Sequence, residues 1–192
     1  FSLETACCKV FGSEMMFRAA NDALQIAGGI GYSKEFPFEQ TVRDSRINLI
    51  FEGSSEIMHL FIAREAVDKH LQIAGDVVMP GKSLGQRLAG LARSALFYGW
   101  WYPSRWFGWG FWPRCSGFGS LAGHVRFVER NARRLARGVF HSMIRFGPKL
   151  ELRQAVLFRL VDVGAELFAM AATCARARWL LRRDRASGER AV

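Results

Sequence analysis

The chain has 192 residues, half of them hydrophobic, and a formal net charge of +10. Residues 1–76 hold 7 Lys and Arg against 11 Asp and Glu, whereas residues 77–192 hold 20 against 6, so we predict two modules, the basic one facing an anionic partner. The four Cys lack metal-ligand spacing and the four His form no cluster, which argues against a metal site.

The first predicted element is a helix over the N-terminal residues. Apolar side chains recur there at helical spacing, and Gly28 and Gly29 end the pattern, where residues tolerant of positive φ are favoured. Glycines there let a phosphate or ribose approach the backbone closely, although an ordinary C-cap and tight turn is the alternative. The apolar positions are Leu3, Cys7, Val10, Phe17, Ala20, Leu24 and Ala27.

The next informative feature is Glu52, which lies between the apolar run 47–51 and a Gly-Ser-Ser turn that can open a helix. An apolar flank disfavours an ionised carboxylate and a helix N-terminus favours it, so this Glu is a candidate general base. A solvated turn Glu is the alternative. We expect Ser54 or Ser55 to be the N-cap, with Glu56 offsetting the helix dipole.

Three motifs occur in a fixed order: Ala-Leu-Gln-Ile with Gly-Gly-Ile-Gly-Tyr after it, the pair Arg43-Asp44, and Phe-Glu-Gly-Ser-Ser-Glu-Ile followed by Ile-Ala-Arg-Glu at 62–65. Together they resemble the C-terminal end of the catalytic domain of acyl-CoA dehydrogenases. These flavoenzymes introduce a trans double bond next to a fatty acyl thioester. The resemblance implies an FAD cofactor, an acyl-CoA substrate and an electron-transfer flavoprotein as partner.

The resemblance also implies a role for each matching position. Glu52 falls on the base that removes the α-proton, and Gly53 falls where the backbone meets the thioester end of the substrate. A Glu at this position favours straight-chain substrates, since some branched-chain members take their base from another helix. The expected FAD contacts of the neighbouring subunit, which imply a homodimer, are Gln25, Ile26, Ala27, Gly28 and Gly29, and a further flavin-contacting turn comprises Ser54, Ser55 and Glu56.

The second module resembles, more loosely, the extra C-terminal helical domain of the very-long-chain branch of this family. In that branch the domain covers a tetramer surface and is associated with membrane attachment. Its best match is residues 154–177, predicted as one amphipathic helix with Val156, Leu160, Val163, Leu167 and Met170 inward. We predict three segments: the end of the catalytic helical domain at 1–76, a linker and aromatic-rich segment at 77–120, and a basic helical domain at 121–192.

The aromatic-rich stretch 96–115 contains five of the six Trp. Pro103, Pro113 and Arg105 argue against a membrane-spanning helix, but Trp and Tyr favour the lipid headgroup layer. The alternative is an aromatic loop closing over a helical core. Single-strand nucleic-acid binding also combines arginines with aromatics, but no recognition motif accompanies them, so we expect no nucleic acid. The following arginines would meet anionic lipid: Arg126, Arg130, Arg133, Arg134 and Arg137.

The sequence therefore predicts an all-α fragment of an FAD-dependent, dimeric, long-chain acyl-CoA dehydrogenase. Because the domains that complete the acyl pocket in the family are absent, we expect the fragment alone to be inactive. A non-catalytic helical dimerisation module, or a membrane-surface interaction module, is the alternative. The Arg-, Ala- and Gly-rich composition favours a bacterial protein acting in the cytoplasm, at most peripheral to the inner membrane, whereas a eukaryotic protein would be mitochondrial.

Overall fold

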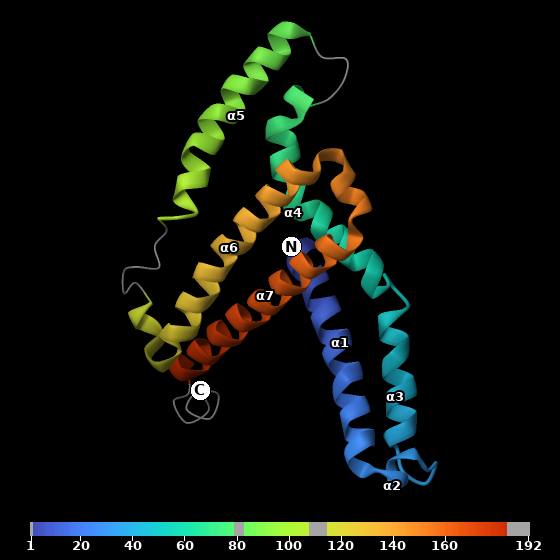
Figure 1. Cartoon of the computed structure of the whole chain (residues 1–192). Helices are drawn as coiled ribbons and strands as arrows, with labels where there is room; N and C mark the ends of the chain where they lie inside the picture. Colours follow the sequence, from blue (N-terminus) through green and yellow to red (C-terminus); the bar gives the residue numbers. More distant parts are fainter. Residues whose placement is uncertain (1, 79–82, 108–114, 184–192) are drawn as a thin grey trace. The chain divides into compact units, whose positions relative to one another are not determined.

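The computed structural model describes residues 2–78, 83–107 and 115–183, with the side chains of residues 76 and 78 left out. Throughout these ranges the regular structure is helical and contains no strand (Figure 1), which confirms the all-α prediction. The α-helices are α1 (Ser2–Ala27), α2 (Gly29–Tyr32), α3 (Phe38–Arg46), α4 (Ser55–Val78), α5 (Leu84–Ser104), α6 (Ala122–Phe146) and α7 (Gln154–Arg183). Three short 3₁₀ segments are η1 (Ile47–Leu49), η3 (Ser116–Leu121) and η4 (Gly147–Leu152).

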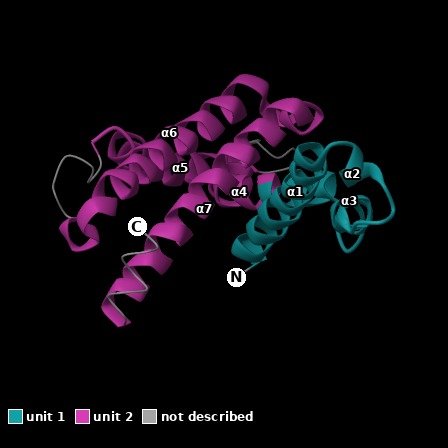
Figure 2. Ribbon diagram, turned by 90° about the horizontal axis from the view of Figure 1, so that it is seen from below, with its two compact units in different colours: residues 1–62 teal, residues 63–192 magenta. Residues whose placement is uncertain are grey.

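The contacts divide the chain into two compact units, residues 1–62 and residues 63–192 (Figure 2). The division falls inside α4, whereas the sequence predicted a boundary after residue 76. A division by contacts within the fold does not test where one evolutionary domain ends and the next begins. The three predicted segments therefore stay a prediction. In the described residues α4 runs to Val78, and α5 begins at Leu84 after its N-cap Ser83.

The first unit is built on α1, which packs against α3 and the short α2. Its core uses small residues, with Val10 and Ser45 the most completely buried side chains. Burying a hydroxyl is unfavourable unless it finds a partner. Ser45 Oγ donates to the carbonyl oxygen of Val42 at 2.9 Å, and Ser13 Oγ donates to that of Lys9 at 2.8 Å. This core is therefore lined by small side chains, and the hydroxyls of Ser13 and Ser45 form hydrogen bonds within their own helices.

The second unit contains an antiparallel pair, α6 and α7, joined by η4 (Figure 1). Glycines mark the close approach of the two helices. A Cβ on Gly138 would lie 3.7 Å from Leu160 Cδ2, and a Cβ on Gly164 would lie 3.5 Å from Leu135 Cδ2. The prediction that Val163 faces inward is wrong, because its side chain is 47% exposed. The buried positions of α7 are instead Leu157, Val161, Ala165, Leu167, Cys174 and Ala177.

An aromatic cluster joins α4, α5 and α6 within this unit. His70 is buried and stacks against the Tyr98 ring, with the ring centroids 5.8 Å apart. The Trp101 ring meets His70 edge-on at 4.9 Å, and Phe140 lies 4.9 Å from Tyr98. Burial, followed by the charge of Lys69, lowers the pKa of His70. The cluster therefore holds a neutral imidazole among rings from three helices.

The described part of the aromatic-rich stretch is helical up to Ser104. Phe97 to Tyr102 belong to α5, which extends to Ser104 and contains Pro103 in its last turn. A proline there removes only one backbone donor near the end of the helix. Trp109, Trp112 and Pro113 lie outside the described residues. Among the helices of the described ranges, none is long and apolar enough to cross a bilayer.

Candidate active site

The turn that carries Glu52 has an unusual backbone conformation. Glu52 has φ 52°, which makes it the one non-glycine residue with positive φ in the described parts of the chain. Gly53 follows with φ 91°, and a Cβ there would lie 2.8 Å from Met58 Sδ. Two successive residues with positive φ turn the chain sharply from η1 into α4 and leave the Glu52 side chain exposed. A strained residue next to a helix start is typical of functional sites.

A lysine from α1 bonds to this turn. The ammonium Nζ of Lys9 donates to the carbonyl oxygen of Gly53 at 2.5 Å. Lys9 is half-buried and 44 residues away in sequence, so the contact ties the turn to the helix that forms the core of the first unit. Sequence reasoning missed Lys9, because nothing in the local pattern of α1 distinguishes it from a solvated lysine.

The N-terminus of α4 follows directly. Ser54 is its N-cap, as its Oγ accepts from the backbone N–H of Ile57 at 3.5 Å, so one of the two serines predicted as caps has this role. The pKa of Glu56 is lowered, first by a bond from its own backbone N–H and then by one from the Ser54 side chain, with smaller contributions from His59 and Arg46. Glu56 therefore stays ionised at the positive end of the α4 dipole.

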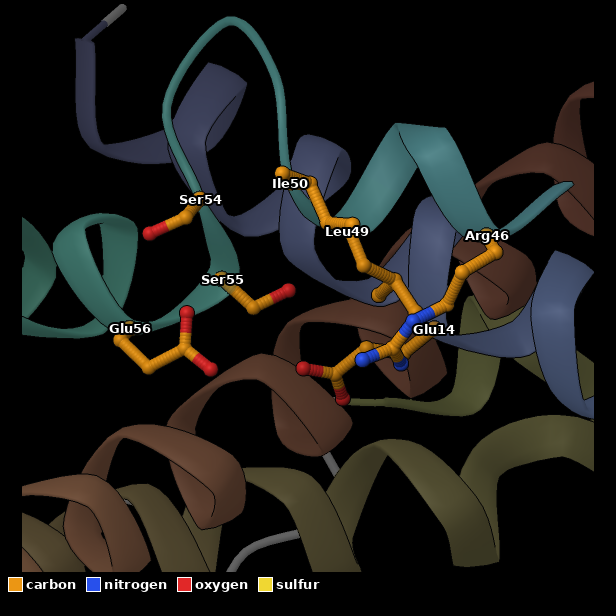
Figure 3. Close-up of a pocket in the computed structure, with 7 residues that line it drawn as sticks. All are labelled: Glu14, Arg46, Leu49, Ile50, Ser54, Ser55 and Glu56. Carbon is orange, nitrogen blue, oxygen red and sulfur yellow. The ribbon is translucent and has the colours of Figure 1, made fainter.

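A hollow of about 330 Å³ opens beside this helix start. Figure 3 shows Ser55 and Glu56 on one side and Glu14 and Arg46 on the other, with the carboxylates of the two glutamates directed into the space between. The Ser55 Oγ atom is buried and has no hydrogen-bond partner within the described structure. The complete lining is Glu14, Arg46, Leu49, Ile50, Ser54, Ser55 and Glu56.

The predicted turn residues Ser54, Ser55 and Glu56 thus all line this hollow, and Glu52 and Gly53 directly precede them in the chain. Glu14 and Arg46 were missed by sequence reasoning. Arg46 lies on α3 with its guanidinium 5.3 Å from the centroid of the Phe17 ring, an arrangement that no local motif announces. The nearby Arg43, part of a recognised motif, pairs instead with Glu39 one turn earlier on α3.

The second group of predicted residues lies at the other end of α1. Gly28 has φ 60°, as predicted for a helix end, and its N–H donates to the carbonyl oxygen of Gln25 at 3.2 Å. Gly29, in contrast, begins α2 and has no positive φ. A Cβ on either glycine would meet no atom within 4 Å. Gln25 and Ile26 are exposed, and Ile26 is 87% exposed. The backbone and side chains of residues 25–29 are therefore accessible to a ligand.

No metal chemistry is indicated by the part of the chain that the structure describes, where no group of three His, Cys, Asp or Glu side chains could hold a metal ion. The four cysteines are free. Cys7 and Cys174 are buried, and burial, followed by the neighbouring Cys8 and Glu4, raises the pKa of the Cys7 thiol. Cys8 is exposed and Cys115 is half-buried.

Comparison with known proteins identifies the family of the chain. The family model described as acyl-CoA dehydrogenase, C-terminal domain, matches residues 2–67. A probable acyl-CoA dehydrogenase of Mycobacterium tuberculosis, FadE10, is 48% identical over 98% of this chain and 31% of its own length. The chain belongs to the acyl-CoA dehydrogenase family. The matched residues include every predicted site position, and the FadE10 match extends through the basic second module as well.

Two further relatives support the membership. The human mitochondrial very long-chain specific acyl-CoA dehydrogenase is 31% identical over 92% of this chain and 27% of its own length. A crystal structure of an acyl-CoA dehydrogenase from Bacillus anthracis, complexed with FAD, superposes with a TM-score of 0.68 and 26% identity, covering 95% of this chain and 28% of that one. The chain thus spans less than a third of the length of these relatives.

Proposed function

We propose that this chain is the C-terminal part of an FAD-dependent acyl-CoA dehydrogenase that introduces an α,β double bond into straight-chain, long-chain fatty acyl-CoA. The observation that carries the proposal is the geometry of Glu52. Its carboxylate is borne by a residue with φ 52°, between a 3₁₀ turn and the start of α4, within a motif of this family. Backbone strain of this kind is kept where it positions a reacting group.

The reaction requires a base and a hydride acceptor. FAD, when bound, accepts the hydride that leaves the β-carbon. The Glu52 carboxylate takes the α-proton, so that two C–H bonds break and one C=C bond forms. Gly53 gives the thioester end of the substrate access to the backbone beside the base. Electrons then pass to an electron-transfer flavoprotein as partner.

The residues present suit a flavin nucleotide in three respects. The backbone at Gly28 and Gly29 is open, so a phosphate or ribose of the cofactor can approach it closely. The buried Ser55 hydroxyl lacks a partner in the described structure and offers a hydrogen bond to a polar group that enters the hollow. Arg46 supplies positive charge on the opposite wall.

A homodimer explains why the predicted FAD contacts form two groups. The Lys9–Gly53 bond ties the Glu52 turn to the first third of α1, whereas Gly28 lies 19 residues further along the chain. At 1.5 Å per residue the two groups are about 28 Å apart along the helix axis. We therefore assign Ser54–Glu56 to the cofactor of their own subunit and Gln25–Gly29 to the cofactor of the neighbouring subunit.

The test is anaerobic reduction of the bound flavin by acyl-CoA in the full-length enzyme. Glu52→Gln removes the basic lone pair but keeps the shape, so reduction should slow by a factor of roughly 10² to 10⁴ with FAD still bound. Glu35→Gln is the matched control, since Glu35 is an exposed glutamate of the same unit outside the site. Normal reduction in Glu52→Gln would place the base elsewhere.

A second function is favoured by the outer surface of α5. Leu84, Leu88 and Leu91 share one face and are 81%, 66% and 51% exposed, and Leu96 and Trp100, one turn apart, are each 80% exposed. Arginines are plentiful in the same module. We propose peripheral attachment of this module to an anionic membrane, at the inner face of a bacterial cytoplasmic membrane, in addition to the dehydrogenase function.

A further inference from the structure

The turn that carries Glu52 is secured at its two ends by backbone hydrogen bonds. Before it, the N–H of Phe51 donates to the carbonyl oxygen of Ile47 at 3.1 Å, and after it, the N–H of Met58 donates to that of Ser54 at 2.9 Å. Glu52 and Gly53 lie between these bonds, both with positive φ. A residue with a Cβ keeps this conformation only where its surroundings hold it.

Lys9 anchors the middle of the turn through a hydrogen bond. Its ammonium donates to the Gly53 carbonyl oxygen at 2.5 Å, from a half-buried position on α1. A bond from a charged donor is about twice as strong as one between neutral groups. The Gly53 carbonyl lies in the peptide plane between Gly53 and Ser54, so the bond anchors the turn one residue after Glu52 and limits its movement relative to α1.

We propose that Lys9 is a positioning residue for Glu52, a role that rests on the proposed function of Glu52 as the base. With the Gly53 carbonyl anchored, Glu52 stays in the left-handed conformation that sets the direction of its carboxylate. Without the anchor, the two residues relax toward more favourable backbone angles and the carboxylate moves. Lys9 itself touches neither the substrate nor the cofactor in this assignment.

The experiment uses the full-length enzyme with FAD bound. Lys9→Met keeps most of the aliphatic side chain but removes the donor, and flavin reduction per bound FAD should slow by about 10- to 100-fold, the range for a small misplacement of a reacting group. The acyl-CoA concentration that gives half-maximal reduction should change less than the rate does. Lys9→Arg, which keeps a charged donor of sufficient reach, should recover most of the rate.

Lys34→Met is the matched control, because Lys34 is an exposed lysine of the same unit and the substitution removes the same charge. It should reduce its flavin at the normal rate. A lower melting temperature in Lys9→Met with an unchanged rate per bound FAD would show a structural role only and overturn the proposal. If Lys9→Met purifies without FAD, Lys9→Gln takes its place, since its amide is too short to reach the carbonyl, and a normal rate in that variant overturns the proposal equally.

Glu52→Gln is measured alongside, so that two kinds of failure are distinguished. A slow Glu52→Gln with a normal Lys9→Met would refute the role of Lys9 and leave the proposed function intact. A normal Glu52→Gln would refute the proposed function itself, whatever Lys9→Met does. Slow reduction in both, with recovery in Lys9→Arg, is the result that the proposal predicts.

Discussion

The imidazole Nδ1 of His70 on α4 lies 3.0 Å from the hydroxyl oxygen of Tyr98 on α5, inside a cluster of aromatic rings. This pair links α4 to α5. A hydrogen bond from Ser94 Oγ to the carbonyl oxygen of Ile73, at 3.3 Å, also links them. Both side chains are affected by their surroundings. Burial raises the pKa of Tyr98 and lowers that of His70, so each is favoured in its neutral form.

The first prediction follows from the lowered pKa of His70. Below the ordinary pKa of about 6.5, the unfolded chain binds a proton at this residue more readily than the folded chain does, so protonation favours unfolding. The stability that the neutral His70 contributes should therefore be fully present at neutral pH. It should decrease as the pH falls below the pKa of this residue in the unfolded chain. The melting temperature should drop between about pH 7.5 and about pH 5.5, and His70→Phe should reduce that drop. An equal drop in both proteins would contradict this assignment.

The second prediction separates stability from activity at Glu52. Positive φ costs an L-residue with a Cβ roughly 1–2 kcal/mol, and glycine avoids this cost at the expense of some additional chain entropy. Glu52→Gly should therefore raise the free energy of unfolding by up to about 1 kcal/mol, measured by denaturant unfolding, while abolishing the reaction. Glu35→Gly, at an exposed position without positive φ, should be neutral or destabilising. Destabilisation by Glu52→Gly would argue against strain at this turn.

The third prediction tests the shared active site. A Cβ at Gly29 meets no atom within 4 Å and the residue has no positive φ, so Gly29→Val should leave the melting temperature of the apoprotein nearly unchanged. In the dimer it should nevertheless lower FAD occupancy, because the added atoms occupy the approach of the neighbouring subunit's cofactor.

Hybrid dimers extend this test. A dimer of one Gly29→Val subunit and one Glu52→Gln subunit carries both defects in one active site and neither in the other. Co-expression of the two variants should therefore restore about half of the normal activity per hybrid dimer, although each variant alone is less active than the normal enzyme. If the hybrids stay inactive, Gln25–Gly29 and Glu52 do not belong to sites on different subunits in the way that we propose.

The fourth prediction concerns the exposed apolar residues of α5. The full-length protein should co-sediment with anionic vesicles at low salt and release as salt rises, because attraction of basic residues is worth about 1 kcal/mol each and is screened over a Debye length. Leu88→Gln combined with Trp100→Gln should weaken the binding at least several-fold. Ile144→Gln is the control, since Ile144 is 68% exposed on α6 of the same unit. Equal binding to neutral and to anionic vesicles would contradict the proposed attachment to an anionic membrane. It would favour a role of this surface in protein–protein contacts.

The N-terminal helix and the helix start just after Glu52 were predictable because they depend on local signals. Gly28 does end α1 with positive φ, and a serine does cap α4, since both features require particular residue types at particular positions. Lys9, Glu14 and Arg46 were not predictable in the same way. Lys9 and Glu14 reach the site from α1, which is distant in sequence, and Arg46 reaches it from the last residue of α3. An isolated charged residue on a helix carries no signal of what it meets in the fold.

The second unit shows a different limit of sequence reasoning. The helix at 154–177 was predicted correctly and Leu167 is buried as predicted, but the prediction for Val163 is wrong, because large apolar residues were taken to mark the interior. The interface of α6 with α7 is built instead around Gly138 and Gly164, with Ala165 buried beside them. Small residues that permit close approach contribute little to a hydrophobic pattern, so the pattern wrongly placed Val163, which is exposed, on the inner face.

The most direct test of the central claim isolates proton removal from hydride transfer. An acyl-CoA with no hydrogen on its β-carbon cannot be oxidised, yet its α-hydrogen can still be exchanged by a base with deuterium from D₂O. The full-length enzyme should catalyse this exchange, measured by mass spectrometry of the thioester, and Glu52→Gln should slow it by roughly 10² to 10⁴ with FAD content unchanged. Exchange at the normal rate in Glu52→Gln would contradict the assignment of Glu52 as the base.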